Sequence, residues 1–187
     1  MAANGPSVAA PNPWGWNRAA YTKSDIRFSG AGYDFTLHDV RATDKQTPFD
    51  AETYFGFSTI TIPQTNLRAG YFIKDHIAVS LGYDHMKYVM INNQTVGFSG
   101  HIDDPQYASY VQADGNIQLV PSFLTLEHTD GLNYINAEIE LHKVIYKKNR
   151  FEFNSFLGGG LGALMPKSNV KLMGNPRSDE FHFAGYG

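Results

Sequence analysis

The segment Ile135-Asn136-Ala137-Glu138-Ile139-Glu140-Leu141-His142 alternates apolar and polar side chains without interruption. Successive side chains of a β-strand point to opposite faces of the sheet. The segment therefore predicts a strand with one wholly apolar face, while its two glutamates and His142 lie on the other face. It is the clearest pattern of period two in the chain, and we take it as the start of a wider sheet.

Similar alternation occurs on both sides of this segment. We predict strands over residues 25–40, 61–73, 77–90, 132–146 and 151–164, and a sixth strand that begins near Glu180. In the first of them the alternation changes phase at Gly30-Ala31-Gly32, where we expect a β-bulge. No segment has a convincing helical period, and none reaches the roughly 18 apolar residues of a membrane helix.

The connections between these strands differ greatly in length. Residues 74–76 and 147–150 form tight turns, whereas the links over residues 41–60, 91–131 and 165–179 are long. Membrane β-barrels have short periplasmic turns and long external loops, and loops of this length are uncommon in compact soluble domains. The pattern predicts an antiparallel up-and-down transmembrane β-barrel, with about six strands present of eight or more.

Alternation alone does not say which face meets the solvent, because a soluble barrel with an apolar interior shows the same pattern. The polar faces carry small residues, namely Ala78, Ser80, Gly82, Gly158, Gly160 and Gly162. Small residues suit the interior of a narrow barrel, and charges facing lipid would be costly. We therefore predict that the apolar face meets lipid. The polar residues expected inside are Arg68, Asp84, Glu138, Glu140, His142 and Asn154, which either pair and plug the interior or line a small pore.

Composition excludes several classes of function. The net charge is −3 with 18% charged residues, so there is no basic surface for nucleic acid. The chain has no cysteine, which excludes disulfides and thiolate metal sites. Its seven histidines are scattered without the spacing of a metal site, so we expect neither a metal nor a cofactor.

One polar group at the expected outer end of the barrel could carry chemistry. It consists of Asp84, His85, Lys87, Glu127, His128 and Asp130. A histidine oriented by a carboxylate can act as a general base, so His85 and His128, with Asp84 and Asp130, are the candidate catalytic residues. The alternative is a hydrogen-bonded cluster that ties the long loop to the rim. No nucleophile accompanies the group at a definite spacing, so we assign no catalytic residue.

Four blocks of sequence resemble a bacterial outer-membrane β-barrel family of the small OmpA- and OmpW-like type. They are Gly15-Trp16-Asn17-Arg18, Tyr21-Thr22-Lys23-Ser24-Asp25-Ile26, Gly82-Tyr83-Asp84-His85-Met86-Lys87-Tyr88-Val89 and His128-Thr129-Asp130-Gly131-Leu132-Asn133-Tyr134. The resemblance covers about residues 14–187 and implies a fold and a location but no activity. Such barrels close with an even number of strands, so we expect this barrel to lack part of its C-terminal side. Alternatively, the lead-in segment supplies a further strand.

These observations lead to one main hypothesis and two rivals. Residues 1–24 form a lead-in segment and residues 25–187 form a porin-like barrel in the outer membrane of a Gram-negative bacterium. The barrel is a non-enzymatic monomer with a plugged or narrow lumen; it contacts lipid and lipopolysaccharide and binds an unknown partner through its external loops. The first rival is a barrel-embedded enzyme that modifies lipid or lipopolysaccharide. The second is a soluble barrel that binds a small apolar ligand.

Overall fold

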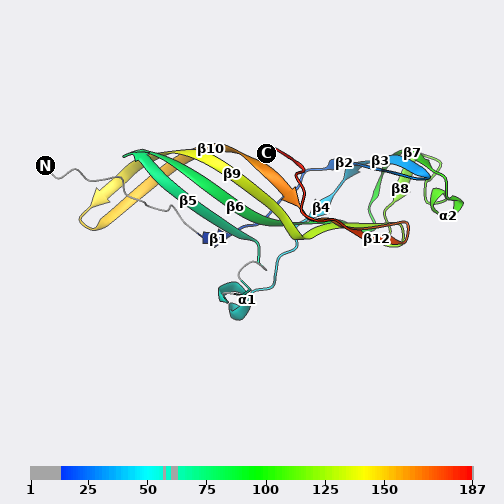
Figure 1. Cartoon of the computed structure of the whole chain (residues 1–187), viewed down its shortest axis with the longest axis horizontal. Helices are drawn as coiled ribbons and strands as arrows, with labels where there is room; N and C mark the ends of the chain where they lie inside the picture. Colours follow the sequence, from blue (N-terminus) through cyan, green and yellow to red (C-terminus); the bar gives the residue numbers. More distant parts are fainter. Residues whose placement is uncertain (1–13, 57, 60–62, 187) are drawn as a thin grey trace.

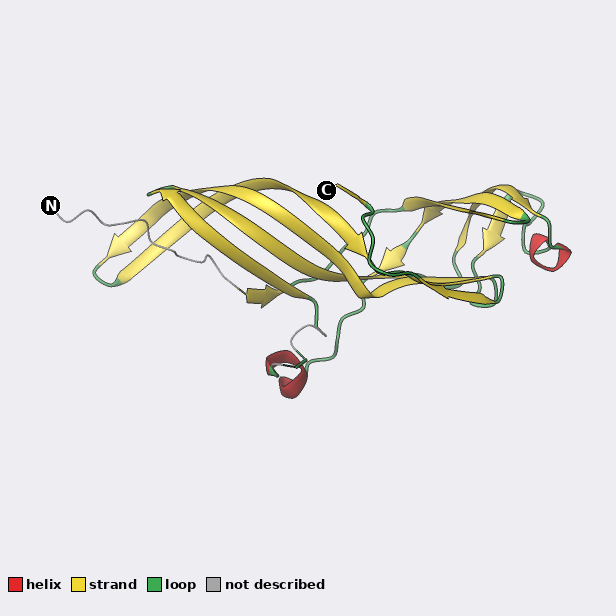
Figure 2. Ribbon diagram, viewed as in Figure 1, coloured by secondary structure: helices red, strands yellow, loops and turns green. Residues whose placement is uncertain are grey.

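The computed structural model describes residues 14–56, 58–59 and 63–186. Antiparallel β-strands are the main secondary structure of the protein, which confirms the predicted all-β class (Figures 1 and 2). The molecule is elongated, and a curved sheet occupies one end. The other end is a smaller two-layered β-unit, in which strands of residues 24–40 and 95–118 form one layer and strands of residues 124–127 and 169–178 form the other.

The curved sheet contains the strands predicted over residues 61–73, 77–90, 132–146 and 151–164. Its main path runs, in spatial order, through β1 (Trp14–Trp16), β5 (Thr65–Lys74), β6 (Ile77–Met90), β9 (Leu124–Lys148), β10 (Phe151–Pro166) and β13 (Gly185–Tyr186). In the central register Ala69 lies opposite Leu81, which lies opposite Ala137, which in turn lies opposite Leu161. Residues that face each other across a ladder lie on the same face of the sheet. The apolar residues of the four central strands therefore form one surface.

The tight turns are where the sequence predicts them. β5 and β6 are joined by residues 75–76, and β9 and β10 by residues 149–150. Asn149 has a φ of 54°, a left-handed conformation that asparagine tolerates better than most residues. These short turns hold each pair of neighbouring strands antiparallel.

The prediction of a single strand over residues 25–40 is wrong. The segment forms a hairpin of β2 (Ser24–Gly30) and β3 (Tyr33–Val40), in a separate sheet with β7 (Thr95–Ile102) and β8 (Asn116–Gln118). The phase change at residues 30–32 is a reversal of the chain rather than a bulge, and Gly32 supplies the positive φ of 81° that the reversal needs. The hairpin places Phe28 opposite Phe35, so the two aromatic rings pack together.

The long links are also folded, contrary to their prediction as loops. The first holds β4 (Ala42–Thr43) and the short helix α1 (Ala51–Phe55), and the second holds β7, β8 and the helical turn α2 (Pro105–Ala108). The third forms a hairpin of β11 (Asn169–Leu172) and β12 (Asn175–Ser178), which pairs with the start of β9.

These folded links enclose the apolar core of the protein. The buried residues are Phe35, Leu37, Val40, Met90, Val96, Ile102, Ile117, Leu119, Phe123, Leu124 and Leu126. Most of them come from the links or from the β2–β3 hairpin. Burial of this apolar surface offsets the conformational entropy of ordering long connections, which is why the links are structured.

The two ends of the large sheet differ from the predicted barrel. Residues 14–16 of the lead-in segment pair with residues 65–67 of β5, so the lead-in does supply a strand, and its first 13 residues lie outside those described. The sixth strand does not begin near Glu180 as predicted: it is limited to Gly185 and Tyr186, and ahead of it His182 and Ala184 each donate one backbone hydrogen bond to β10. Within the described residues the sheet ends at β1 and β13, and no pairing closes it into a barrel.

Candidate functional site

One face of the central strands is apolar and exposed. We call this face the apolar band; its residues are Leu67, Ala69, Tyr71, Val79, Leu81, Ile135, Ala137, Ile139, Leu141, Leu157 and Leu161. The larger members are all well exposed, with Ile139 at 59%, Leu157 at 74% and Leu161 at 77%. Single exposed apolar residues are ordinary on protein surfaces, but a contiguous surface of this kind marks contact with an apolar environment or partner.

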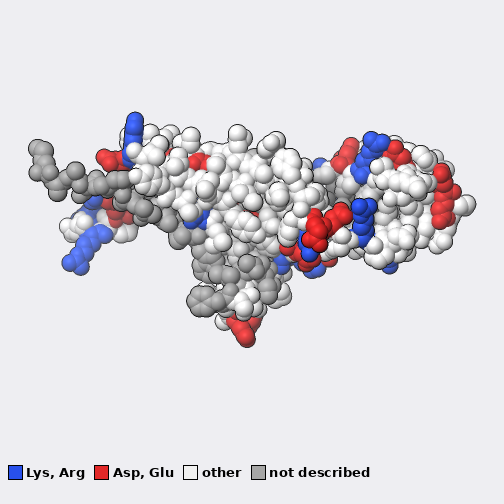
Figure 3. Space-filling model, viewed as in Figure 1, with Lys and Arg blue, Asp and Glu red and all other residues white. Residues whose placement is uncertain are grey.

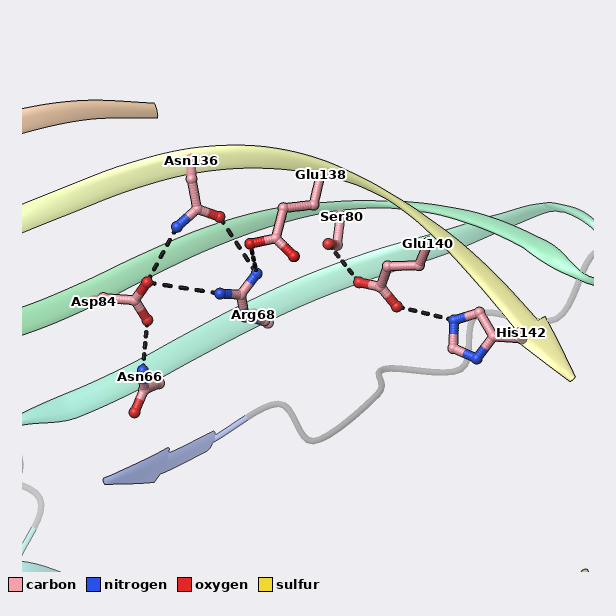
Figure 4. Close-up of polar contacts among 8 residues, drawn as sticks. All are labelled: Asn66, Arg68, Ser80, Asp84, Asn136, Glu138, Glu140 and His142. Atoms are coloured by element: carbon pink, nitrogen blue, oxygen red, sulfur yellow. Dashed lines mark hydrogen bonds and ion pairs between the residues drawn. The ribbon is translucent and has the colours of Figure 1, made fainter. Parts of the chain in front are cut away.

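The opposite face carries a network of hydrogen bonds and ion pairs (Figure 4). We call it the polar network; its residues are Asn66, Arg68, Ser80, Asp84, Asn136, Glu138, Glu140 and His142. At its centre Arg68 Nη1 lies 2.5 Å from Glu138 Oε1, and Arg68 Nη2 lies 3.6 Å from Asp84 Oδ2. Asn66 and Asn136 each donate a hydrogen bond to one oxygen of Asp84, over 2.6 and 3.1 Å. The carboxylates around Arg68 are thus held by an ion pair or by amide donors.

A second part of the network surrounds Glu140, which is only 2% exposed. The Ser80 hydroxyl donates to Glu140 Oε1 over 2.7 Å, and His142 Nε2 lies 2.9 Å from Glu140 Oε2. The His142 ring lies between the rings of Phe72 and Phe156, with centroids 4.8 and 5.5 Å away. Both oxygens of this buried carboxylate therefore have partners, as burial of a charge requires.

Glycines on the same face leave room for the network. Gly82 lies between Arg68 and Asn136 in the register, and a Cβ at Gly82 would collide with the Asn136 amide. A Cβ at Gly160 would collide with the Ala137 carbonyl and approach Glu138 Cα within 2.9 Å. The small residues noted in the sequence thus allow long polar side chains from neighbouring strands to meet.

The structure brings together five of the six residues expected in the barrel interior: Arg68, Asp84, Glu138, Glu140 and His142. Asn154 lies apart from them, exposed, and donates to Glu152 Oε1 over 3.1 Å. The register shifts between Phe153 and Asn154, where the sheet becomes irregular. The alternation also places Asn66, Ser80 and Asn136 on the polar faces of their strands, but the predicted list of interior polar residues left them out.

The candidate catalytic residues do not form a pair of histidine and carboxylate among the described residues. Asp84 belongs to the polar network, whereas His85 points to the opposite face, where its Nδ1 lies 2.8 Å from Asn133 Oδ1. Asp130 is exposed and accepts a hydrogen bond from Asn169 over 3.3 Å. The geometry that a carboxylate-oriented base needs is therefore not present at His85.

His128 packs on the ring of Tyr88, which lies opposite it in the register, with ring centroids 5.4 Å apart. Its Nδ1 is buried and has no hydrogen-bond partner in the described part of the chain. Burial lowers the pKa of His128; the nearby His182 also lowers it, while a backbone hydrogen bond with Lys167 opposes the shift. This favours a neutral ring.

A cavity of about 530 Å³ lies beside His85 at the end of the apolar band. Its walls include Lys45, Tyr83, His85, Lys87, Thr129 and Asp130. Lys87 is 9% exposed, and its ammonium donates to Thr47 Oγ1 over 3.0 Å. The sequence predicted one polar group at the outer end of the barrel, and the structure places three of its members, His85, Lys87 and Asp130, at this cavity.

No group of three or more histidine, aspartate or glutamate side chains within residues 14–56, 58–59 and 63–186 could hold a metal ion. In the same part of the chain, no helix has the length and apolar character needed to cross a membrane.

Comparison of the chain with models of protein families, with curated proteins and with solved structures finds no match.

Proposed function

We propose that this protein is an integral outer-membrane β-barrel protein of a bacterium, in which β5, β6, β9 and β10 form part of the barrel wall. The observation that carries the proposal is the separation of the two faces of these strands. The apolar band is exposed, whereas the polar network is sheltered on the opposite face. A soluble barrel would have the reverse arrangement, because water would meet the polar face.

The dimensions of the band fit a bilayer. On β9 the band residues 135, 137, 139 and 141 lie within a nine-residue stretch, 134–142, which is flanked in the same phase by Asn133, which lines the cavity, and by the exposed Lys143. At about 3.3 Å per residue this stretch is about 30 Å long. A tilt of about 40° reduces its height to about 23 Å, close to the apolar band of about 25 Å in outer-membrane barrels.

The distribution of charge supports the same orientation. Figure 3 shows few charged atoms along the middle of the curved sheet and clusters of them at both ends of the molecule. The lysines at positions 74, 147 and 148 lie in or next to the tight turns. In the proposed orientation these turns face the periplasm, and the two-layered unit with the buried core stands outside the membrane.

The polar network favours a filled interior over a conducting pore. Arg68 reaches across β6 to contact Glu138 on β9, and Glu140 is held by Ser80 and His142. Groups paired in this way have little freedom to hydrate a passing ion. We therefore propose a plugged or narrow lumen and no enzymatic role.

The proposal requires a partner for the outer edge of β10. Among the described residues this edge pairs with β13 at Ala163 and Leu164, and Pro166 accepts a backbone hydrogen bond from His182, whereas residues 151–162 have no strand along this edge. Unpaired backbone groups are too costly to face hydrocarbon. In the proposed membrane form a partner strand runs along residues 151–162, and the amides of these residues should exchange slowly with solvent in lipid.

The absence of cysteine allows a direct test of orientation. Each position from 135 to 142 is replaced singly by cysteine, labelled with a small fluorophore, and reconstituted in vesicles that contain brominated phosphatidylcholine. We expect strong quenching by bromine at positions 135, 137, 139 and 141 and weak quenching at the four positions between them. Equal quenching at all eight positions, or none at any, would overturn the proposal.

A further inference from the structure

The cavity beside His85 opens on the side of the sheet that carries the apolar band. On β6, Leu81, Tyr83 and His85 share one phase of the alternation, and the register between residues 77 and 86 is regular. Leu81 belongs to the apolar band, and Tyr83 and His85 line the cavity. A lipid whose acyl chains lay along the band would thus have its headgroup at the level of the cavity.

Two lysines line the cavity from different parts of the chain. Lys87 comes from β6, and Lys45 comes from the segment between β4 and α1. Lys87 is almost fully buried, and in the described part of the chain its ammonium makes one hydrogen bond, to the Thr47 hydroxyl, and no ion pair within 4.0 Å. An ammonium has three donors, so two remain for a ligand. Buried charges are normally paired, and this one lacks its counter-ion.

The surrounding groups leave space for an anion. The Lys45 ammonium lies 3.4 Å from Glu127 Oε2, an exposed pair that a ligand can replace or join. Asp130 is the acidic residue of the cavity wall, and its carboxylate accepts a hydrogen bond from Asn169. Burial and the charge of Lys45 lower the pKa of Lys87, while Asp44 and Asp130 act in the opposite direction. An anion between the two ammonium groups would relieve their repulsion.

We propose that this cavity binds the phosphate group of a membrane lipid, held by the ammonium groups of Lys45 and Lys87. Phosphate offers several acceptor oxygens to such donors, and the volume of about 530 Å³ is ample for a headgroup. The lipid as the source of the phosphate rests on the proposed membrane function. The anion site itself rests on the cavity and its two lysines.

The test measures binding to the whole protein in dodecyl maltoside micelles, which carry no phosphate, by isothermal titration calorimetry. The probes are a short-chain phosphatidic acid, the matching diacylglycerol without phosphate, and inorganic phosphate. We expect phosphatidic acid to bind more tightly than inorganic phosphate and the diacylglycerol to bind weakly. Lys87→Gln should weaken phosphatidic acid binding about ten-fold or more, because a hydrogen bond to a charged group is lost.

Two further variants keep the proposal testable. Lys45→Gln removes the more exposed ammonium and should also weaken binding, so the test does not depend on whether the buried Lys87 position tolerates change. Lys148→Gln removes an exposed lysine at the opposite end of β9 and should leave binding unchanged.

Three outcomes would overturn the proposal: equal binding of phosphatidic acid and diacylglycerol, equal effects of Lys45→Gln and Lys148→Gln, and saturation by inorganic phosphate with no gain from the lipid. The last result would leave an anion site but exclude a lipid as its ligand. Bromine quenching along β9 reports membrane orientation separately, so failure of this site and failure of the membrane function are distinguishable.

Discussion

Replacing Ile139 with arginine gives opposite results in a bilayer and in water. Ile139 lies near the middle of the apolar band, opposite Val79 on one side and Gly159 on the other, and it is 59% exposed. Arginine near the midplane of a bilayer costs about 2–4 kcal/mol on the lipid face of a barrel. This corresponds to roughly a 30-fold to several-hundred-fold loss in the folding equilibrium. On a protein surface in water the same exchange would change stability by about 0.5 kcal/mol or less.

The measurement is the urea midpoint of folding into dilauroyl phosphatidylcholine vesicles, followed by tryptophan fluorescence and by band shift in gels. Phe49→Arg is the matched control, because Phe49 is 74% exposed but lies outside the sheet, between β4 and α1. We expect a large fall in the midpoint for Ile139→Arg and a small one for the control. If both variants stay within about 0.5 kcal/mol of the parent protein, the apolar band does not face lipid, and our reasoning about orientation is wrong.

Three further predictions concern the interior of the sheet and the rim. Gly160→Ala should lower stability by about 1–3 kcal/mol, because the added Cβ would meet backbone atoms. The neighbouring Gly159→Ala should be tolerated, because its Cβ would meet nothing within 4 Å. The urea midpoints of the two variants test this difference. Arg68→Met should cost about 1–3 kcal/mol, less than a fully buried pair because the side chain is 25% exposed, and adding Glu138→Gln should restore part of the loss in a double-mutant cycle. Because burial lowers the pKa of His128, the unfolded chain binds a proton more readily than the folded protein does. The stability of the protein should therefore fall as the pH drops below 6.5, the ordinary pKa of histidine. The difference between the urea midpoints at about pH 7.5 and about pH 5.5 should be smaller in His128→Gln.

The two parts of the protein are stabilised by different interactions. Among the described residues, the central part of the curved sheet has no buried apolar cluster, because most of its large apolar side chains lie on the exposed apolar band. Its strands are held together by backbone pairing and by the polar network. The buried core belongs to the two-layered unit. If the bilayer serves as the apolar phase for the sheet, destabilising changes in the core should affect the two-layered unit more than the strands of the curved sheet.

The alternating pattern was enough to predict the central strands, their two faces and most of the polar network. Where β6 and β9 pair regularly, over residues 77–86 and 132–141, each side chain's face follows from its position in the alternation, which assigns Leu81 and Ile139 to one face and Glu138 and Glu140 to the other. This works because the period of a strand is a local property of the backbone. The same reasoning correctly predicted the tight turns, where few residues separate two alternating runs.

Only the tertiary structure decided where the long connections go and which partners the polar residues meet. The β2–β3 hairpin, the pairing of Trp14–Trp16 with β5 and the shared core of the folded links depend on contacts between distant residues, which alternation does not encode. The meeting of Lys45 with Lys87 at one cavity likewise follows from the packing of remote segments. Local sequence determines the face of the strand on which a side chain lies. Pairing between distant segments determines which other residues it contacts.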